Sequence, residues 1–242
     1  MLSDILLRTP ARSIDDVVGA MTAIDERLPD DDGLKWFNRL YLRVTVSVRK
    51  AVEGATFRDP VFLGALDVVF ANLYFAAVSA DRGGGAGAPA AWQPLLEARH
   101  RRGIARIQFA LAGMNAHINR DLPEGIVRTF RALGGNPLTD RGRRQDFDSV
   151  NALLERVEQD VRADFSVGIV GVIDELGHDV DDAVAMWKVR SARAAAWTNS
   201  KVMWTLRDVP VLHDEFFERL DGLTGLASRG LLRPALLKVP SA

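Results

Sequence analysis

The chain has no cysteine among its 242 residues, which excludes disulfides, thiolate zinc sites and cysteine nucleophiles. It also has no excess of either charge, because 31 basic and 32 acidic side chains leave a formal net charge of −1. A nucleic-acid-binding domain normally carries a basic surface or stripe, so we expect no nucleic-acid partner. The two short basic clusters, Arg99–Arg102 and Arg141–Arg144, are interpreted as solvated loops.

The sequence also lacks long apolar runs and targeting signals. No stretch approaches the roughly 20 apolar residues that cross a bilayer, so we expect no membrane span. The segment Met1–Ser13 has an acidic residue early and no long apolar run, unlike a secretory signal. These features predict a soluble, cytoplasmic protein.

Helical periodicity dominates the rest of the chain. The hydrophobic content of 48% is enough to bury a sizeable core. Helices are predicted over Ser13–Leu28, Gly33–Val52, Val61–Ser79, Gly103–Leu122, Glu124–Leu133, Phe147 to about Leu176, Val180–Arg207 and Leu212–Leu226. Ser13 with Asp16, and Asp59 before Pro60, are helix-start signals. We predict an all-α bundle of eight or nine helices in a single domain, 1–242, with a flexible glycine-rich loop at 83–90.

The most informative segment is the predicted helix Gly103–Leu122. It has no permanently charged side chain between Arg106 and Arg120, and a helix uncharged all round is normally buried. We expect it to be the buried central helix, packed against the equally apolar Val61–Ser79. Buried amides and imidazoles cost free energy unless they are paired, so its polar residues indicate either a site or a satisfied core network.

His117 and Asp121 are four residues apart in this segment, so both can face one point. The spacing suits a general acid/base histidine oriented by a carboxylate, or two ligands of a divalent metal. The alternative is that Asp121 ends the helix before Pro123 while His117 bonds a neighbouring carbonyl.

Three amides, Gln108, Asn115 and Asn119, form a second stripe within about 40° of one another on a helical wheel. They could bind a polar substrate group, or they could join helices through buried hydrogen bonds.

Two further sets of residues are candidates for substrate binding. Asp67 and Asn72 interrupt the apolar helix Val61–Ser79, and a buried carboxylate needs a partner. On the long helix, Arg190, Arg193 and Trp197 share one side and could line an anion-binding or cation–π pocket. Either arginine could supply the charge that Asp67 needs, whereas the alternative is ordinary packing and surface pairing.

Glu97 with His100, and Glu175 with His178, match the spacing of di-iron helix bundles. Arginines around His100 would repel a metal, and Gly177 interrupts the second pair. A di-iron site is therefore the weaker interpretation.

The segments DGLKWFNRLYLRVT (Asp32–Thr45) and IQFALAGMNAHINRDLP (Ile107–Pro123) resemble a bacterial family, domain-of-unknown-function family 5995. This resemblance implies an all-helical fold and no particular activity. A weaker similarity, through the HxxxD spacing of His117 and Asp121, is to the all-α zinc-dependent phospholipase C and P1 nuclease class. That class builds a three-zinc cluster from more histidines than the four present here, His100, His117, His178 and His213.

The sequence favours a small-molecule enzyme that performs acid/base chemistry on a hydrophobic metabolite: cyclisation, isomerisation, elimination or hydrolysis. His117 would be the acid/base and Asp121 its orienting group, and no cofactor is predicted. One alternative is a metal-dependent hydrolase or oxygenase, with His117 and Asp121 as ligands. Another is a non-catalytic helical ligand-binding or scaffold protein, and a homodimer is left open.

Overall fold

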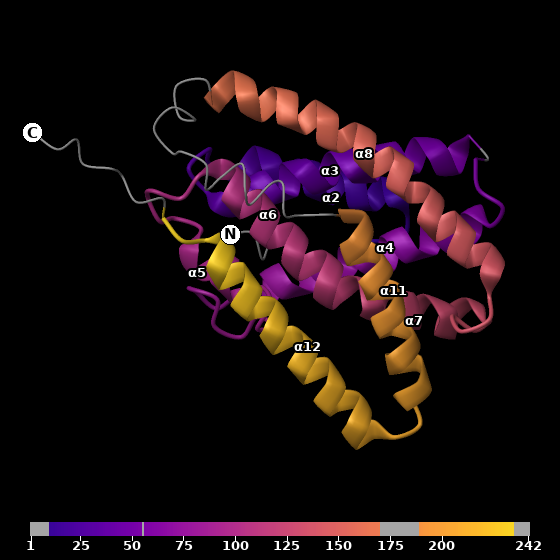
Figure 1. Cartoon of the computed structure of the whole chain (residues 1–242). Helices are drawn as coiled ribbons and strands as arrows, with labels where there is room; N and C mark the ends of the chain where they lie inside the picture. The colour runs from indigo at the N-terminus through magenta and orange to yellow at the C-terminus, as the bar shows by residue number, and fades with distance from the viewer. Residues whose placement is uncertain (1–9, 55, 170–188, 235–242) are drawn as a thin grey trace, which may run out of the picture.

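The computed structural model describes residues 10–54, 56–169 and 189–234, with the backbone alone for 157–169. Within these ranges the chain is helical and has no strand, which confirms the all-α prediction (Figure 1). The elements are α2 (Ile14–Arg27), α3 (Gly33–Glu53), α4 (Pro60–Ala80), α5 (Gln93–Ala98), α6 (Arg106–Ala116), the π-helix η1 (His117–Asp121), α7 (Leu122–Leu133), α8 (Arg141–Ile169), α11 (Val189–Leu206) and α12 (Pro210–Leu231).

Two helices start at the signals predicted from the sequence. The Ser13 hydroxyl accepts the Asp16 N–H, and the Asp16 carboxylate accepts the Ser13 N–H, so α2 begins with a complete capping box. The Asp59 carboxylate accepts the Phe62 N–H at 2.8 Å and caps α4, which Pro60 opens.

The continuous helical stretch α6–η1–α7 runs through the middle of the structure. Its first part packs against α3 and α12, and its last part packs against α4 and α11 (Figure 1). An added Cβ at Gly113 would lie 2.4 Å from the Phe37 ring, and one at Gly33 would lie 2.4 Å from the Phe109 ring. These two pairings let α3 and α6 approach closely, each glycine making room for a phenyl ring of the other helix.

This central helix differs from the prediction at both ends. It starts at Arg106 because Gly103 adopts a left-handed φ of +80° and the Gln108 side chain accepts the Ala105 N–H. It does not end before Pro123, but continues through η1 into α7. The predicted helix Glu124–Leu133 is thus the second half of one long element.

The basic cluster Arg141–Arg144 was wrongly interpreted as a loop. It forms the first turn of α8, because the Asp140 carboxylate accepts the Arg143 N–H at 3.0 Å. Arg143 and Arg144 pair with Asp59 and Asp148, at 2.8 and 2.7 Å.

The other cluster, Arg99–Arg102, does lie outside the helices, yet Arg99 is not solvated. Its guanidinium bonds both carboxylate oxygens of Asp32, the buried N-cap of α3. The predicted helices from Phe147 to about Leu176 and over Val180–Arg207 reach into residues 170–188, which lie outside the described residues.

The glycine-rich segment 83–90 connects α4 to α5 through turns. The Asp81 carboxylate accepts the N–H groups of Gly83 and Gly85, both at 2.9 Å, and both glycines have positive φ.

Among the described residues, one helix, α4, is long and apolar enough to cross a membrane, with 21 residues and a mean hydropathy of 2.0 over its most apolar window. The expectation that no stretch approaches this length was therefore wrong. The same window is 56% buried, and α4 packs against α2, α3 and α7. A core helix of a folded protein passes the same test, so length and composition alone assign no span.

Candidate active site

His117 and Asp121 face each other in the centre of the structure. The Nδ1 of His117 lies 3.0 Å from Oδ2 of Asp121, and both side chains are fully buried. The structure thus brings together the two residues to which the sequence assigns acid/base chemistry.

Both residues belong to a π-helical turn that the sequence analysis missed. The Leu122 N–H donates to the His117 carbonyl, five residues back instead of four. A proline inside an α-helix loses a hydrogen bond and clashes with the carbonyl four residues before it, and Pro123 follows this widened turn directly. Single π-turns of this kind occur often at functional sites, and Pro123 is the sequence signal that could have indicated one.

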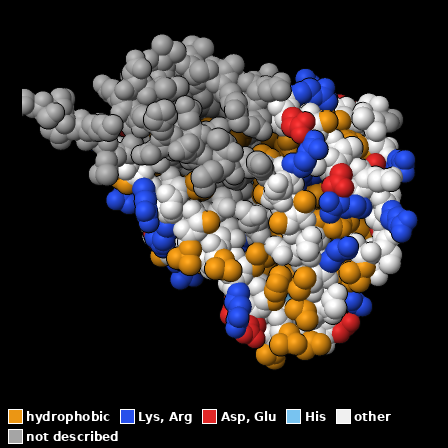
Figure 2. Space-filling view, in the orientation of Figure 1, with side chains coloured by type: hydrophobic (Ala, Val, Ile, Leu, Met, Phe, Trp, Pro, Cys, Tyr) orange, Lys and Arg blue, Asp and Glu red, His pale blue; other side chains and the backbone are white. Residues whose placement is uncertain are grey.

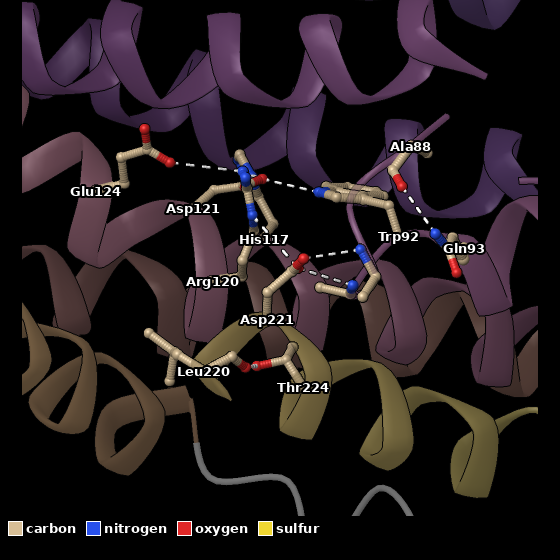
Figure 3. Close-up of polar contacts among 12 residues, drawn as sticks. Ala88, Trp92, Gln93, His117, Arg120, Asp121, Glu124, Leu220, Asp221 and Thr224 are labelled. Atoms are coloured by element: carbon tan, nitrogen blue, oxygen red, sulfur yellow. Dashed lines mark hydrogen bonds and ion pairs between the residues drawn. The ribbon is translucent and has the colours of Figure 1, made fainter. Parts of the chain in front are cut away.

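Asp121 is held from three sides (Figure 3). Besides His117, the Trp92 indole N–H donates to its Oδ2 at 3.0 Å, and Arg120 donates to its Oδ1 at 2.7 Å. Burial lowers the pKa of Arg120, but the Asp121 carboxylate more than offsets this and the net pKa is raised. These three contacts fix the orientation of the Asp121 side chain toward the imidazole.

Arg120 extends this network to α12. Its guanidinium lies 3.5 Å from Asp221 and 3.6 Å from Glu124. Asp221 in turn accepts the N–H groups of Ala90 and Ala91, both at 2.9 Å, just before α5. The network in Figure 3 therefore joins η1, α12 and the segment before α5.

Five aromatic rings surround the imidazole of His117. Phe70 stacks on it with 3.4 Å between ring centroids and 6° between planes, and Tyr41 lies edge-on at 4.5 Å. The other three rings, at 5.7 to 6.1 Å, are those of Phe37, Trp92 and Tyr74. Four of the five residues are buried, and Phe70 alone among them is partly exposed.

The hydrogen bond to Asp121 determines which imidazole nitrogen carries the proton. Because a carboxylate only accepts, Nδ1 is the protonated nitrogen and Nε2 has a free lone pair. Burial lowers the pKa of His117, against the opposing effect of the Asp121 hydrogen bond, so the ring is neutral near pH 7. The buried Nε2 has no hydrogen-bond partner among the described residues.

Unbonded polar atoms occur on His117, on the neighbouring Tyr41 and on Asp67. Six buried side-chain polar atoms in the described part of the chain lack a hydrogen bond. Three of them, on Arg49, Arg120 and Glu124, face an opposite charge within 4 Å. The other three are His117 Nε2, the Tyr41 hydroxyl and Asp67 Oδ2, which we call the unbonded trio.

The unbonded trio combines groups of different acidity. Burial raises the pKa of Asp67 to about 7, so its carboxyl exchanges a proton near neutral pH. Burial, and next the charge of Asp67, raise the pKa of Tyr41 well above its usual range, so this phenol stays protonated. Thr45 lies beside the Tyr41 hydroxyl, but the two are not placed for a hydrogen bond. Unbonded buried polar groups are rare and often mark a catalytic role or a bound molecule.

A family model for a family of unknown function, DUF5995, matches residues 14–234. The chain belongs to this family. No curated protein and no solved structure is similar enough to the chain to count as a match. Family membership confirms the resemblance noted in the two sequence segments and assigns no reaction, so the chemistry must be argued from the site.

The three predicted amides all form hydrogen bonds, and two of them bond to α12 or to the residues just after it. Asn115 donates to the Thr224 carbonyl and the Ser228 hydroxyl, at 3.0 and 2.9 Å, and Asn119 donates to Asn115. Gln108 donates to the carbonyls of Leu231 and Arg233. Asn115 and Gln108 thus join α6 to α12, the structural alternative left open by the sequence, and Asn119 bonds to Asn115 within the same helical stretch.

The remaining predicted residues lie apart from His117. Asn72 exchanges two hydrogen bonds, both of 2.9 Å, with the backbone of Ala11. Arg190 is exposed and pairs with Glu155 at 2.5 Å. Neither Arg190 nor Arg193 pairs with Asp67.

Arg193 and Trp197 belong to a separate buried cluster around Phe147. Arg193 donates to Asn151 at 2.8 Å and to the Phe147 carbonyl at 2.6 Å, and Trp197 packs against Phe147. Burial lowers the pKa of Arg193 to about 9. A guanidinium in this position supports the packing of α8 against α11.

The described residues offer few ligands for the metal sites considered from the sequence. In the described ranges, no group of three or more His, Asp or Glu side chains is placed to hold a metal. His100 is exposed and Glu97 pairs with Arg229 at 2.7 Å, whereas Glu175 and His178 lie outside those ranges.

Proposed function

We propose that this chain is a small-molecule enzyme that transfers protons on an uncharged, hydrophobic carbonyl compound. The observation that carries the proposal is the unbonded trio: one proton acceptor, His117 Nε2, and two oxygen donors, Tyr41 and protonated Asp67. The Tyr41 ring packs against His117, and Asp67 is near enough to Tyr41 to raise its pKa. A carbonyl oxygen accepts two such hydrogen bonds, and a neutral imidazole removes a proton from the adjacent carbon. Tyrosine and a protonated carboxylic acid are an established pair for stabilising an enolate in an apolar site.

The charges around the site favour an uncharged substrate. Arg120, the basic side chain bonded to Asp121, is already neutralised by three carboxylates. An anionic substrate would meet Asp67 and Asp121 without gaining a free cation. Five aromatic rings surround the imidazole, which suits a hydrophobic compound.

Asp121 keeps His117 in the productive tautomer. When Nε2 takes up a proton, the imidazolium formed is stabilised by the Asp121 carboxylate 3.0 Å away. His117 can then return that proton to a different carbon, which gives isomerisation, or to a leaving group, which gives elimination.

Phe70 is the point of entry in this proposal. Its ring covers one face of the imidazole and is only partly buried, so a rotation of this side chain would open the site from the surface. The other four rings around His117 are buried and hold the imidazole in place.

Hydrogen exchange at carbon tests this proposal without knowledge of the product. Uncharged ketones, lactones and esters of graded hydrophobicity are incubated with the protein in D2O, and deuterium uptake next to the carbonyl is followed by mass spectrometry. We expect faster uptake for at least one compound, reduced about 100-fold or more by His117→Gln and also reduced by Tyr41→Phe. His213→Gln is the matched control, because His213 lies 3.1 Å from Asp214 in an exposed pair of the same kind.

Two outcomes would contradict the proposal. One is uptake that persists in His117→Gln, and the other is a panel in which no compound exchanges faster than in buffer. A compound that raises the melting temperature without exchanging would instead support the non-catalytic, ligand-binding alternative.

A further inference from the structure

The hairpin of α11 and α12 carries a concentration of exposed apolar side chains. Nine large hydrophobic residues in the described part of the chain are exposed, and five of them lie between Val209 and Leu226. They form two groups: the tip group, Val209, Val211 and Leu212, and the leucine pair, Leu223 and Leu226. Figure 1 shows the hairpin projecting from the other helices, and Figure 2 shows hydrophobic side chains gathered at its tip and along α12.

The two groups lie on one side of α12. At 100° per residue, Val211, Leu212, Leu223 and Leu226 fall within an arc of about 120°. The centres of the two groups are separated by 13 to 14 residues, which is about 20 Å along the helix. Exposed apolar side chains grouped on one side of a helix are a feature of interaction sites.

A charged pair lies midway between them. Glu215 and Arg219 share the same arc and form an exposed ion pair at 2.5 Å. Their midpoint, residue 217, lies within one residue of the midpoint between the tip group and the leucine pair. Going from the tip toward the C-terminal end of α12, the order on this face is therefore apolar, acidic, basic, apolar.

We infer that this face of α12 binds the same face of a second copy of the chain. In an antiparallel arrangement about a two-fold axis at residue 217, each tip group covers the partner's leucine pair. Each Glu215 then faces the partner's Arg219, so the ion pairs are exchanged between the two copies. A self-complementary order of this kind is what an isologous dimer requires.

The dimer would also bear on the site, since α12 carries Asp221 on another of its faces. Asp221 is bonded to Arg120 and to the segment before α5. Covering α12 would hold that end of the network in place.

Sedimentation velocity and engineered cross-links test the inference together. We expect a dimer for the wild type at micromolar concentration and a monomer for Leu223→Asp/Leu226→Asp. Val61→Asp, at an equally exposed apolar position on α4, should remain dimeric. Circular dichroism of each variant confirms that the fold is retained.

Because the chain has no cysteine, a disulfide reports only on introduced residues. A mixture of Val211→Cys and Leu223→Cys proteins should form a cross-linked heterodimer, whereas a mixture of Val61→Cys and Leu223→Cys should not. A monomeric wild type at 100 µM would overturn the inference, and so would a dimer that survives the double Asp substitution.

Discussion

Replacing Asp67 by asparagine should make the stability of the protein less sensitive to a rise in pH between about 4 and 7. The folded-state pKa of about 7 exceeds the ordinary value of 3.8 because the carboxyl is buried without a partner. Between these two values the unfolded chain ionises Asp67 while the folded chain keeps it protonated. The folded state therefore binds more protons, and the free energy of unfolding falls as the pH rises from about 4 to 7.

The size of this effect follows from the shift. A difference of about three pKa units between the folded and unfolded states lowers the free energy of unfolding by roughly 4 kcal/mol once the pH exceeds both pKa values. Between pH 5 and pH 8 the part lost is roughly 2 to 3 kcal/mol. Asparagine has nearly the shape of the protonated carboxyl and does not titrate, so Asp67→Asn should gain this amount relative to the wild type between pH 5 and pH 8.

Urea unfolding at pH 5, 6, 7 and 8 gives the comparison, because the titration of all other groups cancels in the difference between the two proteins. Asp31→Asn, at an exposed position, controls for the loss of one carboxylate. Parallel curves for wild type and Asp67→Asn would refute the assignment of a buried, proton-exchanging Asp67.

Two further substitutions test the fold and the dyad. Gly113→Ala should cost about 1 to 3 kcal/mol of unfolding free energy, because the new methyl would lie 2.4 Å from the Phe37 ring. Gly19→Ala, on α2 with open space around it, should be neutral or gain up to about 1 kcal/mol. Equal effects in urea unfolding would contradict the close approach of α3 and α6. Trp92→Phe removes one donor to Asp121 and should cost about 1 to 3 kcal/mol, seen as a lower urea midpoint, and an unchanged midpoint would show that this hydrogen bond contributes little.

Local signals in the sequence predicted the helices well. Ser13 and Asp59 cap helices as expected, because a capping side chain acts on backbone groups two or three residues away. The pairing of His117 with Asp121 was also predictable, since both lie on one short segment. The π-turn that contains them was not, because a helical wheel assumes a constant rotation per residue.

Partners distant in sequence could not be predicted. Asn115 bonds to Thr224 and Ser228, more than 100 residues away, and nothing in its own segment identifies them. Tyr41 was missed for a related reason: it lies on the apolar face of α3, and only the packing around it leaves its hydroxyl unbonded.

The protonation of His117 tests the central claim most directly. Nitrogen-15 NMR of histidine-labelled protein reports each imidazole nitrogen separately, and His117→Gln assigns the signals. From pH 7 to pH 8 we expect His117 to be neutral, with the proton on Nδ1 and an unprotonated Nε2. A ring protonated at both nitrogens throughout this range, or a neutral ring with its proton on Nε2, would contradict the role of Nε2 as the catalytic base.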